Sequence, residues 1–347
     1  MKILVANNCV PFVSGGAEHL ADALTRKLNE FGHEALLVRI PFQWEPPNKI
    51  LESILACRLM RLPNVDRVIA FKFPAYFLPH DNKLLWMVHQ FRQAYDLWGT
   101  SFQGMASTPE NLAIRNSIIA SDNSYLPEAR KIYTNSSVTS DRLKKFNGMD
   151  SQVLHPPLLD TQHLHQGPFG DYIFCAGRVT ASKRQHLLVE AMQYVKSGVK
   201  LIIAGRTEAP EDDLRITQLL KNPDIAARVQ FFNRFITEQE KADWFSSSLG
   251  AAYIPYDEDS YGYVTLEAFY SGKPVITTTD SGGILSVVRQ NQTGFVVEPN
   301  APALAAAMDE LFHDKQRAQR LGASGLALIQ SMNLTWEHVV HTLTCHF

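Results

Sequence analysis

Two carboxylates flank a glycine-containing turn in the segment spanning residues 257–268. Asp259 stands before the turn, Gly262 lies within it, and Glu267 follows in an apolar run. The pattern predicts a strand over 251–255, then a loop, then a helix that opens near Gly262. A helix opening presents backbone N–H groups without intrahelical partners and the positive end of the helix dipole. Such an opening can bind phosphate or sugar hydroxyls, while the two carboxylates can accept hydrogen bonds from vicinal hydroxyls.

The segment therefore predicts a site for a nucleotide sugar. The residues that would line it between the two acids are Ser260, Tyr261, Gly262, Tyr263 and Val264. An ordinary strand-loop-helix with solvated acids is the alternative interpretation. A nucleotide sugar also carries phosphates, and the chain supplies two cations for them at the start of another predicted helix.

Arg178 and Lys183 lie five residues apart between a predicted strand over 172–176 and a predicted helix over 184–195. When a sugar leaves a nucleoside diphosphate, negative charge develops on the phosphate oxygens. Two fixed cations can stabilise that charge, so the chemistry needs no metal ion. The sequence therefore predicts Arg178 and Lys183 as catalytic residues, with a pair of solvated surface cations as the alternative. Arg184 shares the turn but is not counted among the candidates.

Paired glycines, Gly15 and Gly16, lie in the loop 14–18, between a predicted strand over 2–6 and a predicted helix over 17–31. Glycine lets a ligand approach the backbone, and the helix opening favours anions. The loop lacks the G-x-G-x-x-G spacing, so it gives little reason to expect a nicotinamide cofactor. We interpret the two glycines as substrate-binding residues, with a simple turn as the alternative.

His89 follows a predicted strand over residues 84–88 and opens a polar run. At the carboxyl end of a parallel strand, its side chain would lie at the edge of the sheet where ligands bind. A lone histidine is also common as a structural group. Asp96 and Asp122 are further candidates for the acceptor side, and the aromatic residues nearby could stack on a sugar ring or fill the core.

The composition is that of a globular protein. Of the 347 residues, 45% are hydrophobic and 20% are charged, and a chain of this length usually forms two domains. The net charge of −2 gives no reason to expect a nucleic-acid partner. The four cysteines are widely separated and lack metal-ligand spacing, which favours a reduced, cytoplasmic compartment. No apolar run reaches the roughly 18–20 residues of a membrane span.

Predicted strands and helices alternate along the chain. Strands are expected at 2–6, 34–39, 65–71, 84–88, 130–134 and 152–154, and again at 172–176, 199–204, 229–232, 250–254, 274–278 and 294–297. The alternation predicts an α/β fold with parallel sheets. A linker rich in histidine, proline and glycine interrupts it, so we expect domains over 1–160 and 161–330. Residues 331–347 are expected to form a helix that packs either on its own domain or back on the first.

These motifs resemble those of retaining glycosyltransferase family 4, the glycosyl transferases group 1. Asp259 and Glu267 match its E-x7-E signature, with Asp in place of the first Glu. The turn 279–283 resembles its D-x-G-G motif, and Ser286 stands where the family carries Glu. The resemblance implies a GT-B fold, in which two Rossmann-like domains face each other across a cleft. It also implies transfer of a hexosyl group from a UDP- or GDP-sugar to an acceptor hydroxyl, with retention at the anomeric carbon and without a metal or other cofactor.

The resemblance also implies roles for single residues. Arg178 and Lys183 match the family's phosphate clamp, and His89 and Asp259 are the further catalytic candidates. His89 would contact the transferred sugar or orient the acceptor. Asp259 would hold the sugar hydroxyls, and Glu267 would hold the ribose of the nucleotide. The acceptor proton would leave toward the departing phosphate.

The remaining implied contacts lie in loops. The turn at Gly15 and Gly16 would face the cleft, and Arg206 and Phe235, each after a predicted strand, would border the nucleotide base. The implied partners are a nucleotide sugar and a carbohydrate or lipid-linked acceptor, in polysaccharide, lipopolysaccharide or glycolipid assembly. The expected location is cytoplasmic, and peripheral contact with the inner face of the membrane stays open.

Other functions fit the same architecture. A nucleotide-sugar 2-epimerase would interconvert nucleotide sugars without an acceptor, and a glycan phosphorylase would need inorganic phosphate. A catalytically silent sugar-nucleotide-binding protein is suggested by Asp259 and Ser286. A basic stretch at 142–146 could instead meet anionic lipid and make the chain a membrane-surface scaffold, although a solvated helix face explains that stretch better.

Overall fold

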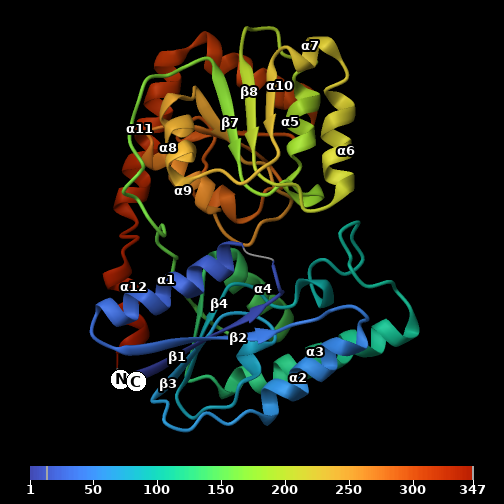
Figure 1. The fold of residues 1–347 in the computed structure, drawn as a ribbon, viewed down its shortest axis with the longest axis vertical. Helices are drawn as coiled ribbons and strands as arrows, with labels where there is room; N and C mark the ends of the chain where they lie inside the picture. Colours follow the sequence, from blue (N-terminus) through green and yellow to red (C-terminus); the bar gives the residue numbers. More distant parts are fainter. Residues whose placement is uncertain (13–14, 346–347) are drawn as a thin grey trace. The chain divides into compact units, whose positions relative to one another are not determined.

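The computed structural model describes residues 1–12 and 15–345, so Ser14 of the glycine loop lies outside the described residues. The chain divides into two compact units. One comprises residues 1–159 together with 334–347, and the other comprises residues 160–333. Each unit holds one six-stranded sheet with helices packed on it (Figure 1). The prediction of an α/β fold with two Rossmann-like units is therefore confirmed.

The sheet of the first unit has the strand order β2-β1-β3-β4-β5-β6, and every pairing in it is parallel. Its strands are β1 (Lys2–Cys9), β2 (Glu34–Pro41), β3 (Arg67–Ala70), β4 (Lys83–Met87), β5 (Lys131–Thr134) and β6 (Gln152–Val153). Its helices are α1 (Gly16–Glu30), α2 (Asn48–Leu59), α3 (Pro109–Tyr125), α4 (Ser137–Asn147) and α12 (Trp336–Thr344), with short 3₁₀ helices η1 (Ala75–Phe77), η2 (Arg92–Ala94) and η3 (Leu126–Glu128). The central strand β4 is buried along its whole length, as expected for a parallel sheet that is covered on both faces.

The C-terminal helix α12 belongs to the first unit. Its apolar stripe, Val339, Val340 and Leu343, is buried in one cluster with apolar side chains of α1, and the two helices lie side by side (Figure 1). At the start of α12, Trp336 Nε1 donates to Leu158 O at 3.1 Å. At its end, Arg67 of β3 donates to Leu343 O at 2.7 Å. The helix thus covers one face of the first sheet.

The sheet of the second unit has the order β12-β11-β10-β7-β8-β9, again with parallel pairings throughout. Its strands are β7 (Tyr172–Ala176), β8 (Lys200–Ala204), β9 (Val229–Phe232), β10 (Gly250–Ala252), β11 (Val275–Thr278) and β12 (Gly294–Val297). Its helices are α5 (Gln185–Ala191), α6 (Pro210–Leu219), α7 (Pro223–Ala226), α8 (Glu238–Ser247), α9 (Tyr263–Tyr270), α10 (Ala301–His313) and α11 (Lys315–Ser331), with 3₁₀ helices η4 (Ala181–Lys183) and η5 (Gly283–Ser286). The strand order reverses between β7 and β10, which is the point where open sheets of this kind bind ligands.

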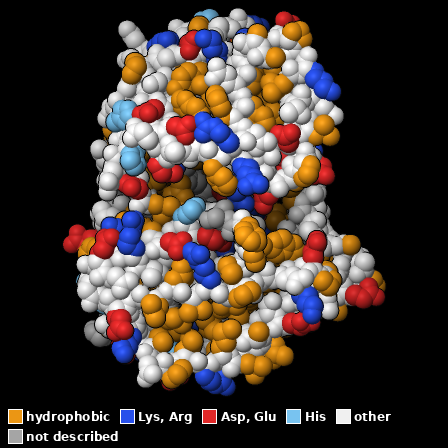
Figure 2. Space-filling model, viewed as in Figure 1, with side chains coloured by type: hydrophobic (Ala, Val, Ile, Leu, Met, Phe, Trp, Pro, Cys, Tyr) orange, Lys and Arg blue, Asp and Glu red, His pale blue; other side chains and the backbone are white. Residues whose placement is uncertain are grey.

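The surface mixes charges of both signs. Figure 2 shows Lys and Arg interspersed with Asp and Glu over the visible face, in keeping with the small net charge. Within the basic stretch 142–146, Arg142 is buried and lies 3.6 Å from Asp96, and Leu143 is buried in the core. Only part of that stretch is therefore open to a membrane surface. Among the described residues, no helix combines the length and apolar character needed to cross a membrane.

Candidate functional site

Lys183 meets Tyr253 and Glu258 at the point where the strand order of the second sheet reverses. Lys183 ends η4, which follows β7, and Tyr253 comes directly after β10. The Lys183 ammonium donates to Tyr253 Oη at 2.5 Å and to the Glu258 carboxylate. Tyr253 Oη in turn donates to Glu258 Oε2 at 3.0 Å. Such a reversal leaves a crevice at the carboxyl ends of the strands, so this cluster lies where a ligand is expected.

The surroundings keep Lys183 charged. Burial acts to lower the pKa of the Lys183 ammonium, but the Glu258 carboxylate and the Tyr253 hydroxyl outweigh it and raise that pKa above its ordinary value. Burial together with the Glu258 charge raises the pKa of the Tyr253 hydroxyl, which therefore stays neutral. Lys183 is thus a fixed cation, which suits an anionic ligand.

The loop that carries Glu258 is held by the neighbouring turn after β11. Backbone hydrogen bonds join Glu258 N to Ser281 O at 3.2 Å and Gly283 N to Glu258 O at 2.8 Å. Gly282 has φ +68°, and a Cβ there would lie 2.5 Å from Glu258 O, so only glycine fits this turn. Ser286 closes η5 by donating to Gly283 O at 2.6 Å. The D-S-G-G turn thus fixes the acidic loop.

Arg184, which was not counted among the candidates, joins three of these loops. Its guanidinium pairs with both carboxylate oxygens of Asp280 at 2.7 Å. The same group donates to Ile254 O at 2.8 Å and Pro255 O at 2.9 Å. Burial acts to raise the pKa of the Asp280 carboxyl, and the hydrogen bonds from Arg184 outweigh it and lower that pKa. Arg184 is therefore a positioning residue that holds the loops after β7, β10 and β11 together.

The chain turns closely over Tyr253 before α9 begins. Gly262 has φ +68°, and a Cβ there would lie 2.3 Å from the Tyr253 ring, so the turn requires glycine. Helix α9 starts at the next residue, as the sequence predicts. Tyr261 is only 1% exposed, so its side chain fills the core and leaves the backbone for a ligand. Asp259 is likewise buried, at 8% exposed. The other predicted lining residues, Ser260, Tyr263 and Val264, are partly exposed.

Glu267 lies on α9, and within the described part of the chain only one of its two carboxylate oxygens has a hydrogen-bond partner. Its Oε1 accepts from Lys241 of α8 at 2.7 Å, and Lys241 also pairs with Glu238 at 2.8 Å. Its Oε2 is buried and has no hydrogen-bond partner within the described part of the chain. Burial raises the pKa of Glu267, while Lys241 acts to lower it. A buried acceptor without a partner is costly, so a ligand hydroxyl is its natural complement.

Arg178, Arg206 and Phe235 lie in loops that follow β7, β8 and β9. Val179 N donates to Arg206 O at 3.0 Å, which places the loops of Arg178 and Arg206 side by side. The Arg178 side chain is 42% exposed, and its guanidinium lies 3.3 Å from Glu208 Oε1. Arg206 lies over the Phe235 ring at 5.9 Å, and Phe235 is 74% exposed. An exposed aromatic ring beside a guanidinium offers a stacking surface for a planar group.

The predicted contacts Gly15, Gly16 and His89 of the first unit follow the carboxyl ends of strands β1 and β4, which flank β3. Gly15 caps α1 and Gly16 opens it. Glu18, in the first turn of α1, pairs with Lys72 at 2.6 Å, and Lys72 follows β3. His89 follows β4, and its Nδ1 lies 2.5 Å from Gln90 O. The strand order reverses at β1 and β3, so these residues also lie at an edge where ligands bind.

Asp122 is not an acceptor contact, and this expectation is wrong. It is fully buried on α3 and accepts from Tyr76 Oη at 2.9 Å and Tyr95 Oη at 2.6 Å. Burial raises the pKa of its carboxyl to about 7, although both tyrosines act to lower it. Asp96 is ion-paired with Arg92 at 2.6 Å. Asp122 therefore belongs to the core of the first unit.

The site contains four residues that the sequence did not single out: Tyr253, Glu258, Lys241 and Arg184. Each acts through a contact with a residue at least 26 positions away in the chain. The acidic run 257–259 marked the region of Glu258 but not which acid would face Lys183. Only the three-dimensional structure shows that Glu258 is the acid of this run that contacts Lys183.

The chain is similar to proteins of known function. Residues 168–327 match the family of glycosyl transferases group 1. The chain is 25% identical over 369 residues to a GDP-mannose-dependent alpha-(1-6)-phosphatidylinositol monomannoside mannosyltransferase of Mycobacterium tuberculosis, covering 93% of this chain and 92% of that protein. It is 27% identical over 172 residues to the capsular polysaccharide biosynthesis glycosyltransferase CapM of Staphylococcus aureus, covering 47% of this chain but only 43% of that protein.

Solved structures share the fold. The structure of Anabaena HepE in complex with UDP-glucose superposes with a TM-score of 0.72 at 15% identity, over 99% of this chain and 98% of that one. At this identity the likeness establishes the fold, which is GT-B.

Proposed function

We propose that the chain is a glycosyltransferase that transfers a hexosyl group from a UDP- or GDP-sugar to an acceptor hydroxyl, with retention at the anomeric carbon. The match of residues 168–327 to the glycosyl transferases group 1 family and the similarity to a mannosyltransferase support this proposal. One observation carries the proposal. The Lys183 ammonium, fixed by Tyr253 and Glu258, lies at the strand-order reversal of a doubly wound sheet. A permanent cation at that point suits the diphosphate of a nucleotide sugar.

In the proposed reaction the acceptor oxygen bonds to the anomeric carbon while the bond from that carbon to the phosphate oxygen breaks. The acceptor proton passes to the departing phosphate on the same face of the sugar. Lys183 and Arg178 stabilise the negative charge that develops there, and most of the rate enhancement comes from this stabilisation. No metal or other cofactor takes part.

We assign the remaining contacts with the donor nucleotide sugar to other residues of the same site. Glu267 Oε2 accepts a hydrogen bond from a ribose hydroxyl, which would satisfy that buried oxygen. Asp259 holds sugar hydroxyls, and the backbone of residues 260–264 borders the phosphates at the opening of α9. Phe235 and Arg206 border the base.

On the first unit, His89 and the turn at Gly15 and Gly16 are assigned to the transferred sugar or the acceptor. The acceptor is a carbohydrate or a lipid-linked sugar. This class is supported by the names of two relatives, one acting on a phosphatidylinositol mannoside and one in capsular polysaccharide biosynthesis. We place the reaction in cytoplasmic polysaccharide or glycolipid assembly.

A thermal-shift screen against UDP, GDP, ADP and dTDP, without added metal, tests this proposal. We expect one diphosphate to raise the unfolding temperature selectively, because ligand at about 100 times its dissociation constant adds about 2.7 kcal/mol to the free energy of unfolding. The corresponding sugar nucleotide is then incubated with and without acceptor. A protein that no diphosphate stabilises would contradict the proposal. Epimerisation of the donor without acceptor, or tight binding without turnover, would replace transfer by one of the alternative functions.

A further inference from the structure

A groove lined by arginines lies at the opposite edge of the second sheet from the candidate donor site. Its volume is about 810 Å³, and the polar residues that line it include Arg289, Gln292, Thr293, Arg317, Arg320 and Ser324. They come from the turn 289–293 and from α11. The turn precedes β12, so it lies at the amino ends of the parallel strands. Lys183 and Glu258 follow the carboxyl ends, so the groove is a separate site.

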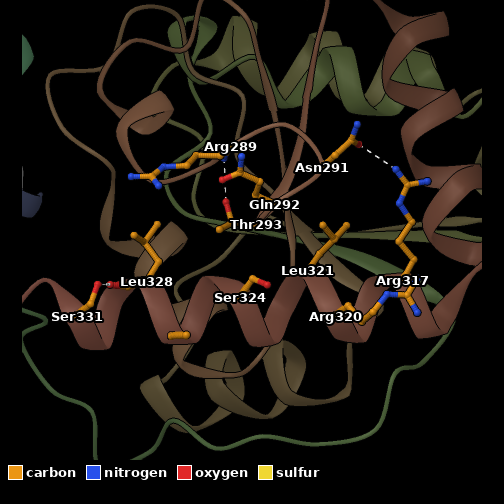
Figure 3. Close-up of a pocket in the computed structure, with 11 residues that line it drawn as sticks. Arg289, Asn291, Gln292, Thr293, Arg317, Arg320, Leu321, Ser324, Leu328 and Ser331 are labelled. Carbon is orange, nitrogen blue, oxygen red and sulfur yellow. Dashed lines mark hydrogen bonds between the residues drawn. The ribbon is translucent and has the colours of Figure 1, made fainter.

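The groove is basic, and Glu310 and Asp314 beside it pair with two of its arginines. Its lining contains three arginines and no acidic residue. Figure 3 shows Arg289 at one end and Arg317 and Arg320 at the other, with Ser324 on α11 between them. The side chain of Arg289 is exposed and, within the described part of the chain, has no ion pair. Arg320 is 67% exposed and lies 3.9 Å from Asp314, beyond direct hydrogen-bonding distance.

The third arginine and a buried threonine give the groove a fixed shape. Arg317 pairs with Glu310, donates to Asn291 Oδ1 at 2.9 Å and lies over the Phe295 ring at 5.2 Å, so it ties the turn to α11. Thr293 Oγ1 donates to Val287 O at 2.7 Å and accepts from Arg289 N at 2.8 Å. Arg289, which has no ion pair in the described part of the chain, and Arg320, whose ion pair with Asp314 is 3.9 Å long, are therefore the two guanidinium groups most accessible to a ligand.

We propose that this groove binds a phosphate-bearing ligand. Guanidinium groups present their N–H donors in a planar fork that matches phosphate oxygens. The Ser324 hydroxyl and the Gln292 amide add neutral donors between the two cationic ends. The volume exceeds that of one phosphate, so the groove also admits the headgroup of an anionic phospholipid. Free phosphate and such a headgroup offer the same chemistry, and the experiment below separates them.

The test compares the full chain with an Arg289→Ala/Arg320→Ala variant, using two probes. One is inorganic phosphate, followed by thermal shift, and the other is vesicles of phosphatidylglycerol in phosphatidylcholine, followed by co-sedimentation. At least one probe should bind the unaltered chain, and the variant should bind it at least about tenfold more weakly. The diphosphate response from the donor screen should be unchanged in the variant, because the groove lies at the other edge of the sheet. Arg317 is left in place because it also holds the turn.

A charge-matched control removes two exposed cations elsewhere. Arg26→Ala/Arg39→Ala takes away side chains that are 59% and 47% exposed, and it should bind both probes as the unaltered chain does. Binding of phosphate without vesicles identifies a free phosphate ligand, and binding of phosphatidylglycerol vesicles but not of pure phosphatidylcholine vesicles identifies a lipid headgroup. The proposal is overturned if the unaltered chain binds neither probe. It is also overturned if the arginine variant and the control bind equally well.

Discussion

Lys183→Met should lower the rate of sugar transfer by about 10²–10³-fold, the usual cost of removing one preorganised donor from the charge that develops in a transition state. Methionine keeps the unbranched stem of the side chain and removes only the ammonium. The phosphate leaving group would then lose the cation that Glu258 and Tyr253 hold in place. The measurement is kcat, from release of the nucleoside diphosphate that the thermal-shift screen selects. The unfolding temperature of the variant shows separately whether it is folded.

Lys200→Met is the matched control for this change. Lys200 starts β8 at the amino edge of the same sheet, is 54% exposed and pairs with Asp171 at 2.9 Å. Exposed pairs of this kind contribute about 0–1 kcal/mol to stability, so this variant should keep the rate and the fold of the unaltered chain. A folded Lys183→Met protein that turns over within about threefold of the Lys200→Met control would remove Lys183 from the reaction.

Glu267→Gln should weaken binding of the nucleoside diphosphate by about 10- to 100-fold. The reason is the buried Oε2, which we assign to a ribose hydroxyl, because hydrogen bonds to charged groups contribute about 1.5–3 kcal/mol. The substitution preserves the size of the side chain and removes its charge. Lys241 keeps its second partner, Glu238, so the protein should stay folded. Calorimetric titration with the diphosphate measures the change in affinity.

Glu238→Gln is the control that separates two roles of Glu267, the proposed hydrogen bond to the ribose and the ion pair with Lys241. Glu238 is 59% exposed and pairs with Lys241 at 2.8 Å. Its loss also removes one carboxylate partner from Lys241 but leaves the ribose acceptor in place, so nucleotide affinity should stay within about twofold of the unaltered value. Equal losses in both variants would mean that Glu267 acts only by neutralising Lys241, and the ribose assignment would fail.

The strands of both sheets could be predicted closely from the sequence. Strands β7, β9 and β12 begin and end at the predicted residues, because each is a short apolar run between turn residues. Helices such as α3 and α11 could not be predicted from the sequence. Among the 17 residues of α3 only Ile118 and Asp122 are buried, so no apolar stripe marks the helix. In α11, Gly322 and Gly325 weaken the helical signal, yet each packs where a Cβ would meet Gly272 O or the Phe269 ring.

The candidate site was partly visible in the sequence. Arg178 and Lys183 stand out because a strand end and a helix start fix their spacing, and Glu267 stands out on the helix after the glycine turn. The choice of Glu258 as the acid that faces Lys183 was not visible. Neighbouring residues in a loop point in directions that depend on the backbone, and here the backbone is set by bonds to the turn that contains Gly282, 24 residues further on.

The most direct test of the account is a crystal structure of the protein with the nucleoside diphosphate that the thermal-shift screen selects. We expect the diphosphate within about 2.7–3.2 Å of the Lys183 ammonium and the Arg178 guanidinium. We also expect a ribose hydroxyl on Glu267 Oε2. A diphosphate bound away from the strand-order reversal between β7 and β10, in the arginine-lined groove or elsewhere, would contradict the account.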